Sequence, residues 1–151
     1  MNQKDIQCIN EIKILALDMI NNANSGHPGA VLSQAPILYT LFANHLRINL
    51  EDDKWINRDR FILSSGHASA LLYSLLHVSG FNISMNDLRS FRRLNSITPG
   101  HPEYGVTPGV ECSTGPLGQG VATAVGMALA ERYIRSLLDI EEEKKQQLIN
   151  Y

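Results

Sequence analysis

Three of the five histidines directly follow a glycine, and these three are the strongest candidates for chemistry: His27, His67 and His101. Each stands at an expected turn or in a Gly/Pro-rich segment, where side chains can point into a shared cleft. An imidazole titrates near neutral pH, so it can hydrogen-bond a substrate and transfer a proton. The alternative is that each glycine-histidine pair forms a tight turn with an exposed ring. The spacing of the three residues matches no zinc site.

A second candidate is the glycine-rich segment at residues 115–120 (GPLGQG), which opens an expected helix. The free N–H groups at a helix N-terminus attract anions. The segment lacks the Lys-Ser/Thr pair of a phosphate-binding loop and the glycine order of a dinucleotide site, so a structural turn with close packing is the alternative. The residues alone predict a turn-rich cleft with three imidazoles and leave an anion site open.

The remaining reactive side chains form no recognisable site. Cys8 and Cys112 have no metal or redox spacing and are expected to be reduced thiols. His45 and His77 fall within expected helices, which assigns them to packing or to solvent. The chain has 13 Lys and Arg against 15 Asp and Glu, a balance that argues against binding to nucleic acid or to a membrane surface. No signal peptide is visible, and a cytoplasmic location is expected.

The elements that must position these residues are predicted from apolar spacing and turn signals. The expected helices cover residues 6–22, 31–46, 68–78, 85–93 and 121–138, with a charged loop at residues 51–60 and an irregular segment at residues 94–120. Residues 60–64 (RFILS) are expected to form a buried strand, and residues 148–151 the start of another. Helices that alternate with strands indicate an α/β fold with a parallel sheet. Because one strand cannot make a sheet, we expect the sheet to be incomplete in this chain.

Three stretches carry no Asp, Glu, Lys or Arg and together make up nearly half of the chain: residues 19–46, 61–86 and 112–130. Polar and turn residues interrupt each stretch, so none is expected to span a membrane. A helix that faces solvent carries charge on its outer face. We therefore expect the uncharged helices to be covered on both sides, by more protein or by a partner subunit. Without that cover, the chain is expected to expose apolar patches and to self-associate.

Four segments resemble the N-terminal domain of transketolases, which depend on thiamine diphosphate. In chain order they are SGHPG at residues 25–29, DRF at residues 59–61 with LS at 63–64 and GH at 66–67, TPGHPE at residues 98–103 and TGPLGQG at residues 114–120. The segments follow the order and spacing of the family, and the resemblance extends over residues 1–151. It implies the thiamine-diphosphate-binding fold, a parallel sheet flanked by helices, of which this chain would be the N-terminal part.

By this resemblance, His67 would contact the diphosphate of the cofactor. Gly115, Pro116 and Leu117 would line the cofactor, with Leu117 packed against its rings. In the family a divalent metal ion, Mg²⁺ or Ca²⁺, bridges the diphosphate to an Asp of a Gly-Asp-Gly motif and to a later Asn. The Glu that activates the aminopyrimidine comes from a later domain across the dimer interface. The chain is expected to lack these groups, so its metal ligands would lie elsewhere and its own cofactor affinity would be low.

The resemblance also makes His27 and His101 the catalytic candidates, because they would hydrogen-bond the substrate hydroxyls and shuttle protons. The implied reaction transfers a two-carbon ketol unit from a ketose phosphate to an aldose phosphate, in the pentose phosphate pathway, within a homodimer. The 151-residue chain alone is expected to be inactive, because it would need a C-terminal portion. Two alternatives stay open. One is a related thiamine-diphosphate transferase such as a dihydroxyacetone synthase, and the other is a non-catalytic product that acts as an interaction module.

Overall fold

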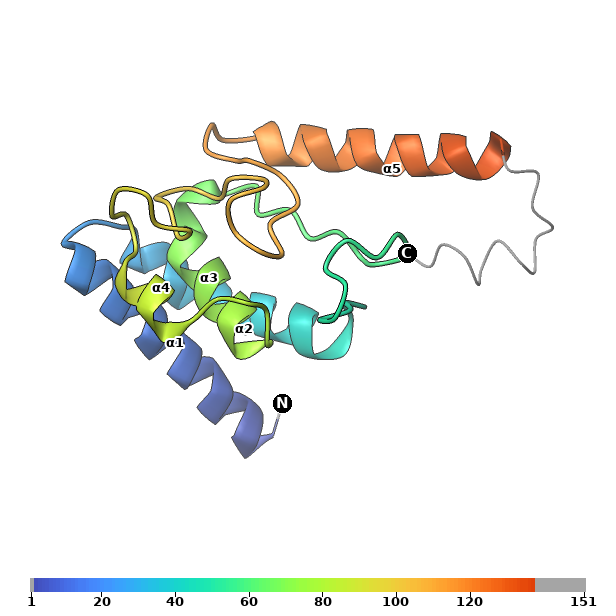
Figure 1. The fold of residues 1–151 in the computed structure, drawn as a ribbon. Coiled ribbons are helices and arrows are strands. Elements are labelled where there is room, and N and C mark those ends of the chain that lie inside the picture. The colour runs from blue at the N-terminus through green and yellow to red at the C-terminus, as the bar shows by residue number, and fades with distance from the viewer. Residues whose placement is uncertain (1, 138–151) are drawn as a thin grey trace.

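Helices make up most of the regular structure. The computed structural model describes residues 2–137, and Figure 1 shows their course. The helices are α1 (Gln3–Ala23), α2 (Pro28–Asn44), a 3₁₀ turn η1 (Gly66–Ala68), α3 (Ser69–Val78), α4 (Met85–Arg89) and α5 (Gln119–Leu137). No helix of this described part is long and apolar enough to cross a membrane. All five predicted helices are present, with shifted ends.

The first helix begins at a capping box. The Asn2 side chain accepts a hydrogen bond from Asp5 N at 3.0 Å, and the Asp5 carboxylate accepts one from Asn2 N at 2.6 Å. These bonds satisfy N–H groups that a helix start leaves free. The helix ends before Asn24, which adopts the left-handed conformation with φ 49°. Its buried side chains recur at helical spacing, as predicted: Ile9, Ile12, Ala16 and Met19.

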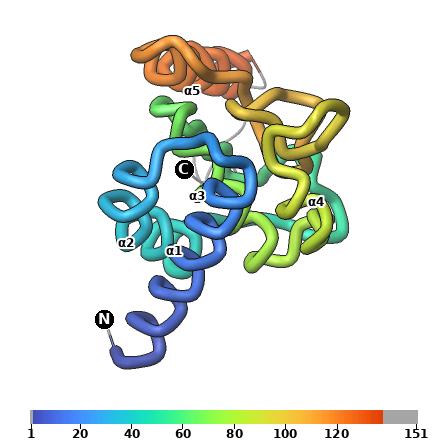
Figure 2. The backbone as a smooth tube through the Cα atoms, turned by 90° about the vertical axis from the view of Figure 1, so that its left-hand side faces the viewer, coloured from blue at the N-terminus to red at the C-terminus, as the bar shows by residue number. Residues whose placement is uncertain are grey.

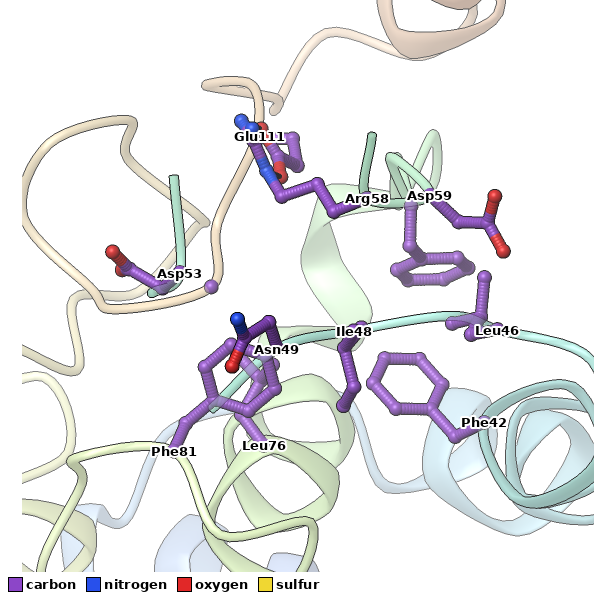
Figure 3. Close-up of a pocket in the computed structure, with 12 residues that line it drawn as sticks. Phe42, Leu46, Ile48, Asn49, Asp53, Arg58, Asp59, Leu76, Phe81 and Glu111 are labelled. Atoms are coloured by element: carbon purple, nitrogen blue, oxygen red, sulfur yellow. Dashed lines mark hydrogen bonds and ion pairs between the residues drawn. The ribbon is translucent and has the colours of Figure 1, made fainter. Parts of the chain in front are cut away.

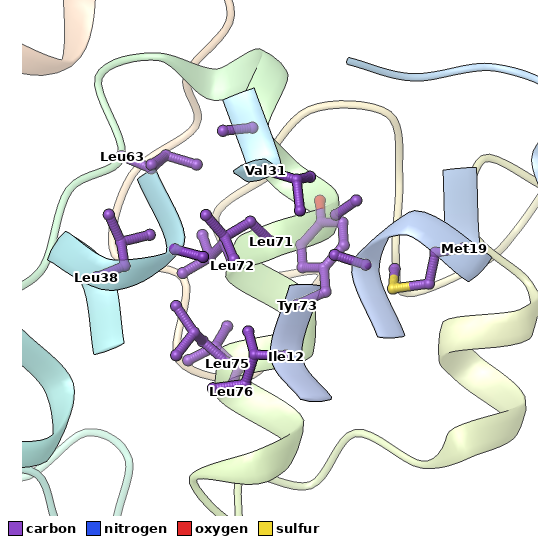
Figure 4. Packing of buried hydrophobic residues seen from close by; sticks show 14 of the residues in the cluster. Ile12, Met19, Val31, Leu38, Leu63, Leu71, Leu72, Tyr73, Leu75 and Leu76 are labelled. Atoms are coloured by element: carbon purple, nitrogen blue, oxygen red, sulfur yellow. The ribbon is translucent and has the colours of Figure 1, made fainter. Parts of the chain in front are cut away.

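The core forms around α3, whose residues 69–76 are all buried. This helix packs against α1 and α2, and Figure 4 shows its leucines close to Ile12 of α1 and Leu38 of α2. Tyr73 in α3 also makes an edge-to-face contact with Phe91, at 6.1 Å between ring centroids. The prediction that an uncharged helix is covered on both sides is therefore confirmed for α3.

Residues 60–64 do not form the predicted strand. The segment has no regular secondary structure and pairs with no other strand within residues 2–137, and only Leu63 in it is buried. A short apolar run does not by itself distinguish a strand from another buried segment. A strand also needs neighbouring strands to be stable, and the second predicted strand, residues 148–151, lies outside the described residues. The predicted parallel sheet is not formed in the part of the chain that the structure describes.

Two irregular segments, residues 45–65 and 90–118, connect these helices. The second segment starts earlier than predicted, because α4 ends at Arg89 and Arg92 has a left-handed φ of 61°. The predicted helix at residues 85–93 was therefore wrong at its C-terminal end. Arg58 connects the two segments, since its Nε and Nη2 donate hydrogen bonds to both carboxylate oxygens of Glu111, at 2.6 and 2.8 Å.

The last described helix, α5, lies apart from the other helices in both views (Figures 1 and 2). Gly120, in its first turn, is its one buried residue. The apolar side chains farther along α5 are exposed: Val121, Val125, Leu129, Tyr133, Ile134 and Leu137. The expected cover on both sides is thus absent for α5 within residues 2–137.

Candidate functional site

His27 occupies the N-cap position of α2, but its imidazole makes no capping hydrogen bond. The preceding Gly26 has φ +152°, and a Cβ there would lie 2.6 Å from Ile20 Cγ1. The turn therefore requires glycine at this position. The following Pro28 fits the first position of a helix, where its missing N–H is not needed. Gly26 and Pro28 therefore favour a turn at this point of the chain. The His27 side chain at the end of the turn is exposed.

His67 lies in the 3₁₀ turn that leads into the buried α3, and it is half-buried. Its ring meets the ring of His27 edge-on, with 5.0 Å between centroids and an interplanar angle of 61°. The neighbouring Gly66 is covered by Thr114, because a Cβ on Gly66 would lie 2.7 Å from Thr114 Oγ1. The turn that carries His67 therefore contacts both the start of α2 and the glycine-rich segment.

His101 belongs to a loop whose backbone is fastened to α3. The carbonyl oxygens of Gly100 and Pro99 accept hydrogen bonds from Ser69 Oγ at 2.7 Å and from Tyr73 Oη at 2.9 Å. Both donors come from the rigid core helix. The loop that holds this third histidine therefore has a fixed position relative to the core, although the histidine side chain itself is exposed.

The electrostatic environment of His101 includes the other two histidines. Partial removal of the His101 ring from water lowers its pKa, and electrostatic repulsion from Arg92, His27 and His67 lowers it further. A Cβ on Gly115 would lie 3.8 Å from His101 Cδ2. Three turns that are distant in sequence thus bring His27, His67 and His101 together, and the glycine-rich segment borders them.

The glycine-rich segment reaches the histidines at Gly115, and residues 116 and 117 that follow have little cover. Pro116 and Leu117 are exposed, and Leu117 presents 77% of its surface to solvent although it is apolar. Gly115 has no atom closer than His101 at the place of a side chain. This part of the segment can therefore approach a ligand with its backbone and with one apolar side chain.

The start of α5 favours close packing over an anion site. A Cβ on Gly120 would lie 2.6 Å from Ser64 Cα, so glycine is needed for the approach of two backbones. Val121 N donates to Ser64 Oγ at 3.1 Å, and Gln119 N donates to Pro116 O at 3.2 Å. These N–H groups are already used within the chain. A structural turn with close packing, the alternative to an anion site at residues 115–120, therefore explains why glycine is needed at position 120.

Arg92 is a site residue that the sequence alone did not reveal. Its charge acts on His101, and its Nη1 donates a hydrogen bond to Ser25 Oγ at 2.6 Å, two residues before His27. One signal was present in the sequence. Arg92 and Arg93 are the charged residues that immediately precede the segment with Gly100 and His101. Nothing in that spacing predicted the left-handed backbone that allows the contact.

A small cavity lies elsewhere and does not mark this site. Figure 3 shows it between the irregular segments, with Phe42, Phe81, Arg58 and Glu111 among its lining residues. Its volume of about 20 Å³ holds one water molecule and no larger ligand. Within residues 2–137, no group of three His, Cys, Asp or Glu side chains is arranged to hold a metal ion.

The site can offer hydrogen bonds and positive charge to a ligand. Its imidazoles are donors or acceptors at neutral pH, and Arg92 adds a permanent cation. No described carboxylate is within ion-pair distance of that cation. Such a set of groups suits a ligand with hydroxyls and negative charge. The exposed Leu117 beside it suits a flat apolar ring.

Known proteins with similar sequences are transketolases. A probable transketolase of Streptococcus pneumoniae is 58% identical over 127 residues, which cover 83% of this chain and 19% of the relative. The transketolase of Geobacillus stearothermophilus is 58% identical over 126 residues, again 83% of this chain and 19% of the relative. The chain therefore spans about a fifth of the length of these relatives.

Solved transketolase structures have the same fold over the matched region. A crystal structure of the Pichia stipitis enzyme, in complex with sedoheptulose 7-phosphate, matches with a TM-score of 0.84 and 52% identity, covering 87% of this chain and 19% of that one. The Leishmania mexicana transketolase matches with a TM-score of 0.87 and 46% identity, covering 93% and 21%. The family profile described as "Transketolase, thiamine diphosphate binding domain" matches residues 4–149. The chain belongs to this transketolase family of thiamine-diphosphate-binding domains.

Proposed function

We propose that residues 1–151 form the first part of the cofactor-binding domain of a transketolase. The observation that carries this proposal is the cluster of His27, His67 and His101 beside Gly115, in a chain about half identical to transketolases. In the complete polypeptide the domain would transfer a two-carbon ketol unit between sugar phosphates. The sugar phosphate in the Pichia stipitis structure supports this choice of substrate class. The alternatives of a dihydroxyacetone synthase or an interaction module have no observation of their own in their favour.

The described residues fit thiamine diphosphate in two respects. The half-buried imidazole of His67 is a donor for a phosphate oxygen. The buried hydroxyl of Thr114 has no hydrogen-bond partner among residues 2–137, although a buried polar group normally has one. On the apolar side, Leu117 and the uncovered Gly115 leave a surface against which the rings of the cofactor can pack.

Each side chain then has one task. His67 holds the diphosphate, while Gly115, Pro116 and Leu117 line the rings. His27 and His101 hydrogen-bond the hydroxyls of the sugar, and His101 accepts a proton from a hydroxyl because its lowered pKa keeps its imidazole neutral. Thiamine diphosphate, when bound, would supply the nucleophilic carbon and the electron sink that ketol transfer needs.

The remaining parts of the machinery would come from outside these residues. We place the Mg²⁺ or Ca²⁺ ligands, on a Gly-Asp-Gly motif and a later Asn, in the part of the polypeptide that would complete the domain and its parallel sheet. A second subunit of a homodimer would complete the site. The cytoplasm is the expected location, since the pentose phosphate pathway operates on soluble sugar phosphates. Residues 1–151 alone should show no ketol transfer.

The proposal is tested by His67→Ala in the complete polypeptide, with His45→Ala as the matched control. His45 is an exposed histidine at the end of α2, away from the cluster. Loss of a hydrogen bond to a charged phosphate should weaken thiamine diphosphate binding by about tenfold or more, as measured by isothermal titration calorimetry. The control should bind as the unchanged protein does. Equal affinity of His67→Ala and control, or no ketol transfer by the complete polypeptide, would contradict the proposal.

A further inference from the structure

Arg92 contacts the neighbours of two histidines at once. Its Nη1 donates a hydrogen bond to Ser25 Oγ at 2.6 Å, in the turn that carries His27. Its side chain also covers Gly100, the residue before His101. A Cβ on Gly100 would lie 3.3 Å from Arg92 Nε and 3.6 Å from Arg92 Cζ. One guanidinium therefore lies between the two segments that hold His27 and His101.

Arg92 itself is held in place from several sides. Its φ of 61° is left-handed, a conformation that is unfavourable for a non-glycine residue. Its backbone N–H donates to Thr98 O at 3.0 Å, which closes the loop at residues 92–98. Its Cζ lies 5.4 Å from the ring centroid of the buried Phe91. Both the backbone and the guanidinium thus have a defined position, and strain at this position is consistent with a functional contact.

The charge of Arg92 is not neutralised by a nearby carboxylate. No Asp or Glu in residues 2–137 is within ion-pair distance of its guanidinium. Its Nε is buried and has no hydrogen-bond partner among these residues. The groups that act on His101 are this charge and the two other imidazoles, His27 and His67, and all of them disfavour a second positive charge there.

We propose that Arg92 is a positioning residue. It holds the turn at residues 25–27 and the loop at residues 100–101 at a fixed separation, which sets how the imidazoles of His27 and His101 lie relative to each other. The inference concerns an arrangement within this chain, and its importance for substrate binding rests on the function proposed above for the two histidines. A general role in folding would instead affect all parts of the chain equally.

The experiment is an NMR titration of the histidines in residues 1–151, with ¹³C and ¹⁵N in the imidazoles. Arg92→Gln removes both the fork of donors and the charge, so it should shift the His27 and His101 signals and move the titration midpoint of His101 upward. Arg92→Lys keeps the charge but cannot make both contacts. It should shift the His27 signals with a smaller change in the midpoint of His101. Ser25→Ala should shift His27 alone.

The matched control is Arg89→Gln, which removes a positive charge from the neighbouring helix α4. Arg89 is exposed and bonds only Asn86 within its own helix, at 3.2 Å. This variant should leave the signals and titration of His27 and His101 as in the unchanged chain. Equal shifts in Arg89→Gln and Arg92→Gln would overturn the proposal. So would unchanged His27 and His101 signals in Arg92→Gln.

A second pair of variants decides the question if Arg92→Gln does not fold, as judged by circular dichroism. Unchanged His27 signals in both Arg92→Lys and Ser25→Ala would then overturn the proposal. The titration needs no cofactor. Shifts in the expected histidines, together with normal thiamine diphosphate binding by the His67→Ala variant, would therefore support the inference about Arg92 while contradicting the proposed function.

Discussion

At the scale of single residues, the protonation of His101 depends on its surroundings. Its pKa lies below the usual value of 6.5, first because the ring is partly removed from water and then because of electrostatic repulsion from Arg92, His27 and His67. A neutral imidazole keeps one nitrogen free to accept a hydrogen bond. The same shift also makes the stability of the chain depend on pH.

We expect the free energy of unfolding to decrease as the pH falls below 6.5. Between this value and the lower pKa of the folded state, the unfolded chain binds a proton at His101 and the folded chain does not. Protons therefore favour the unfolded chain in this window. Above pH 6.5 the His101 imidazole is neutral in both states, so it adds nothing to the pH dependence of the free energy of unfolding. Urea denaturation on both sides of pH 6.5 measures this dependence, and His101→Gln should make it weaker. An equal dependence in variant and unchanged chain would contradict the expectation.

A second prediction at this scale concerns the ion pair that connects the two irregular segments. The side chains of Arg58 and Glu111 are only 11% and 9% exposed, and the carboxylate raises the pKa of Arg58. Glu111→Gln would leave a nearly buried guanidinium without its counter-charge. The free energy of unfolding should fall by about 3 kcal/mol, as measured by urea denaturation.

The matched control for this pair is Lys54→Gln. The ion pair of Lys54 with Asp53 spans 4.0 Å, and its side chains are 54% and 34% exposed. An exposed pair contributes less than about 1 kcal/mol, so this variant should unfold almost as the unchanged chain does. Similar decreases in the free energy of unfolding in Glu111→Gln and Lys54→Gln would contradict the larger contribution expected of the Arg58–Glu111 ion pair.

At the scale of elements, periodicity predicted α1 and α2 well because each buries a recurring apolar stripe. Ile9, Ile12, Ala16 and Met19 lie on one face of α1 and predicted it without tertiary information. Apolar residues did not predict the structure of residues 60–64 correctly, since a strand there would need hydrogen bonds from another strand. The cluster of histidines was suggested by glycine-histidine turns and by the family resemblance. Its geometry depends on tertiary contacts, such as Gly66 against Thr114, which sequence patterns do not encode.

The attachment of α5 can be tested with two of its glycines. Gly120→Ala would place a Cβ 2.6 Å from the backbone at Ser64, so the start of α5 must move and its hydrogen bond to Ser64 must break. Overpacking of this kind costs about 1–3 kcal/mol. Gly126→Ala meets nothing within 4 Å and should stabilise α5 by about 1 kcal/mol through helix propensity. Hydrogen exchange of the α5 amides should therefore accelerate in the first variant and slow in the second. Slower exchange in both would contradict the close approach at Gly120.

At the scale of the whole molecule, α5 exposes a row of apolar side chains. Val125 and Leu129 are exposed by more than half, one helical turn apart. Such surfaces usually meet another protein surface. The uncharged stretch at residues 112–130 predicted this need for cover, and the described residues do not supply it.

We expect residues 1–151 to self-associate through this face. Light scattering after size-exclusion chromatography should give a mass above that of a monomer, and Leu129→Glu should reduce it because a charge in an apolar contact is costly. Ile56→Glu is the matched control, since Ile56 is 80% exposed but lies in the charged loop. A monomer in the unchanged chain, or equal effects of both variants, would contradict this expectation.

The contact between Gly66 and Thr114 has a consequence for the protein as it is made. Thr114 covers the turn that carries His67, and Glu111 reaches back to Arg58. During synthesis on the ribosome, α1, α2 and α3 can begin to pack as soon as they emerge, because the contacts among these three helices lie within residues 3–78. The histidine cluster must wait until residue 114 has left the exit tunnel. A nascent chain arrested before that point would contain a folded core without a finished site.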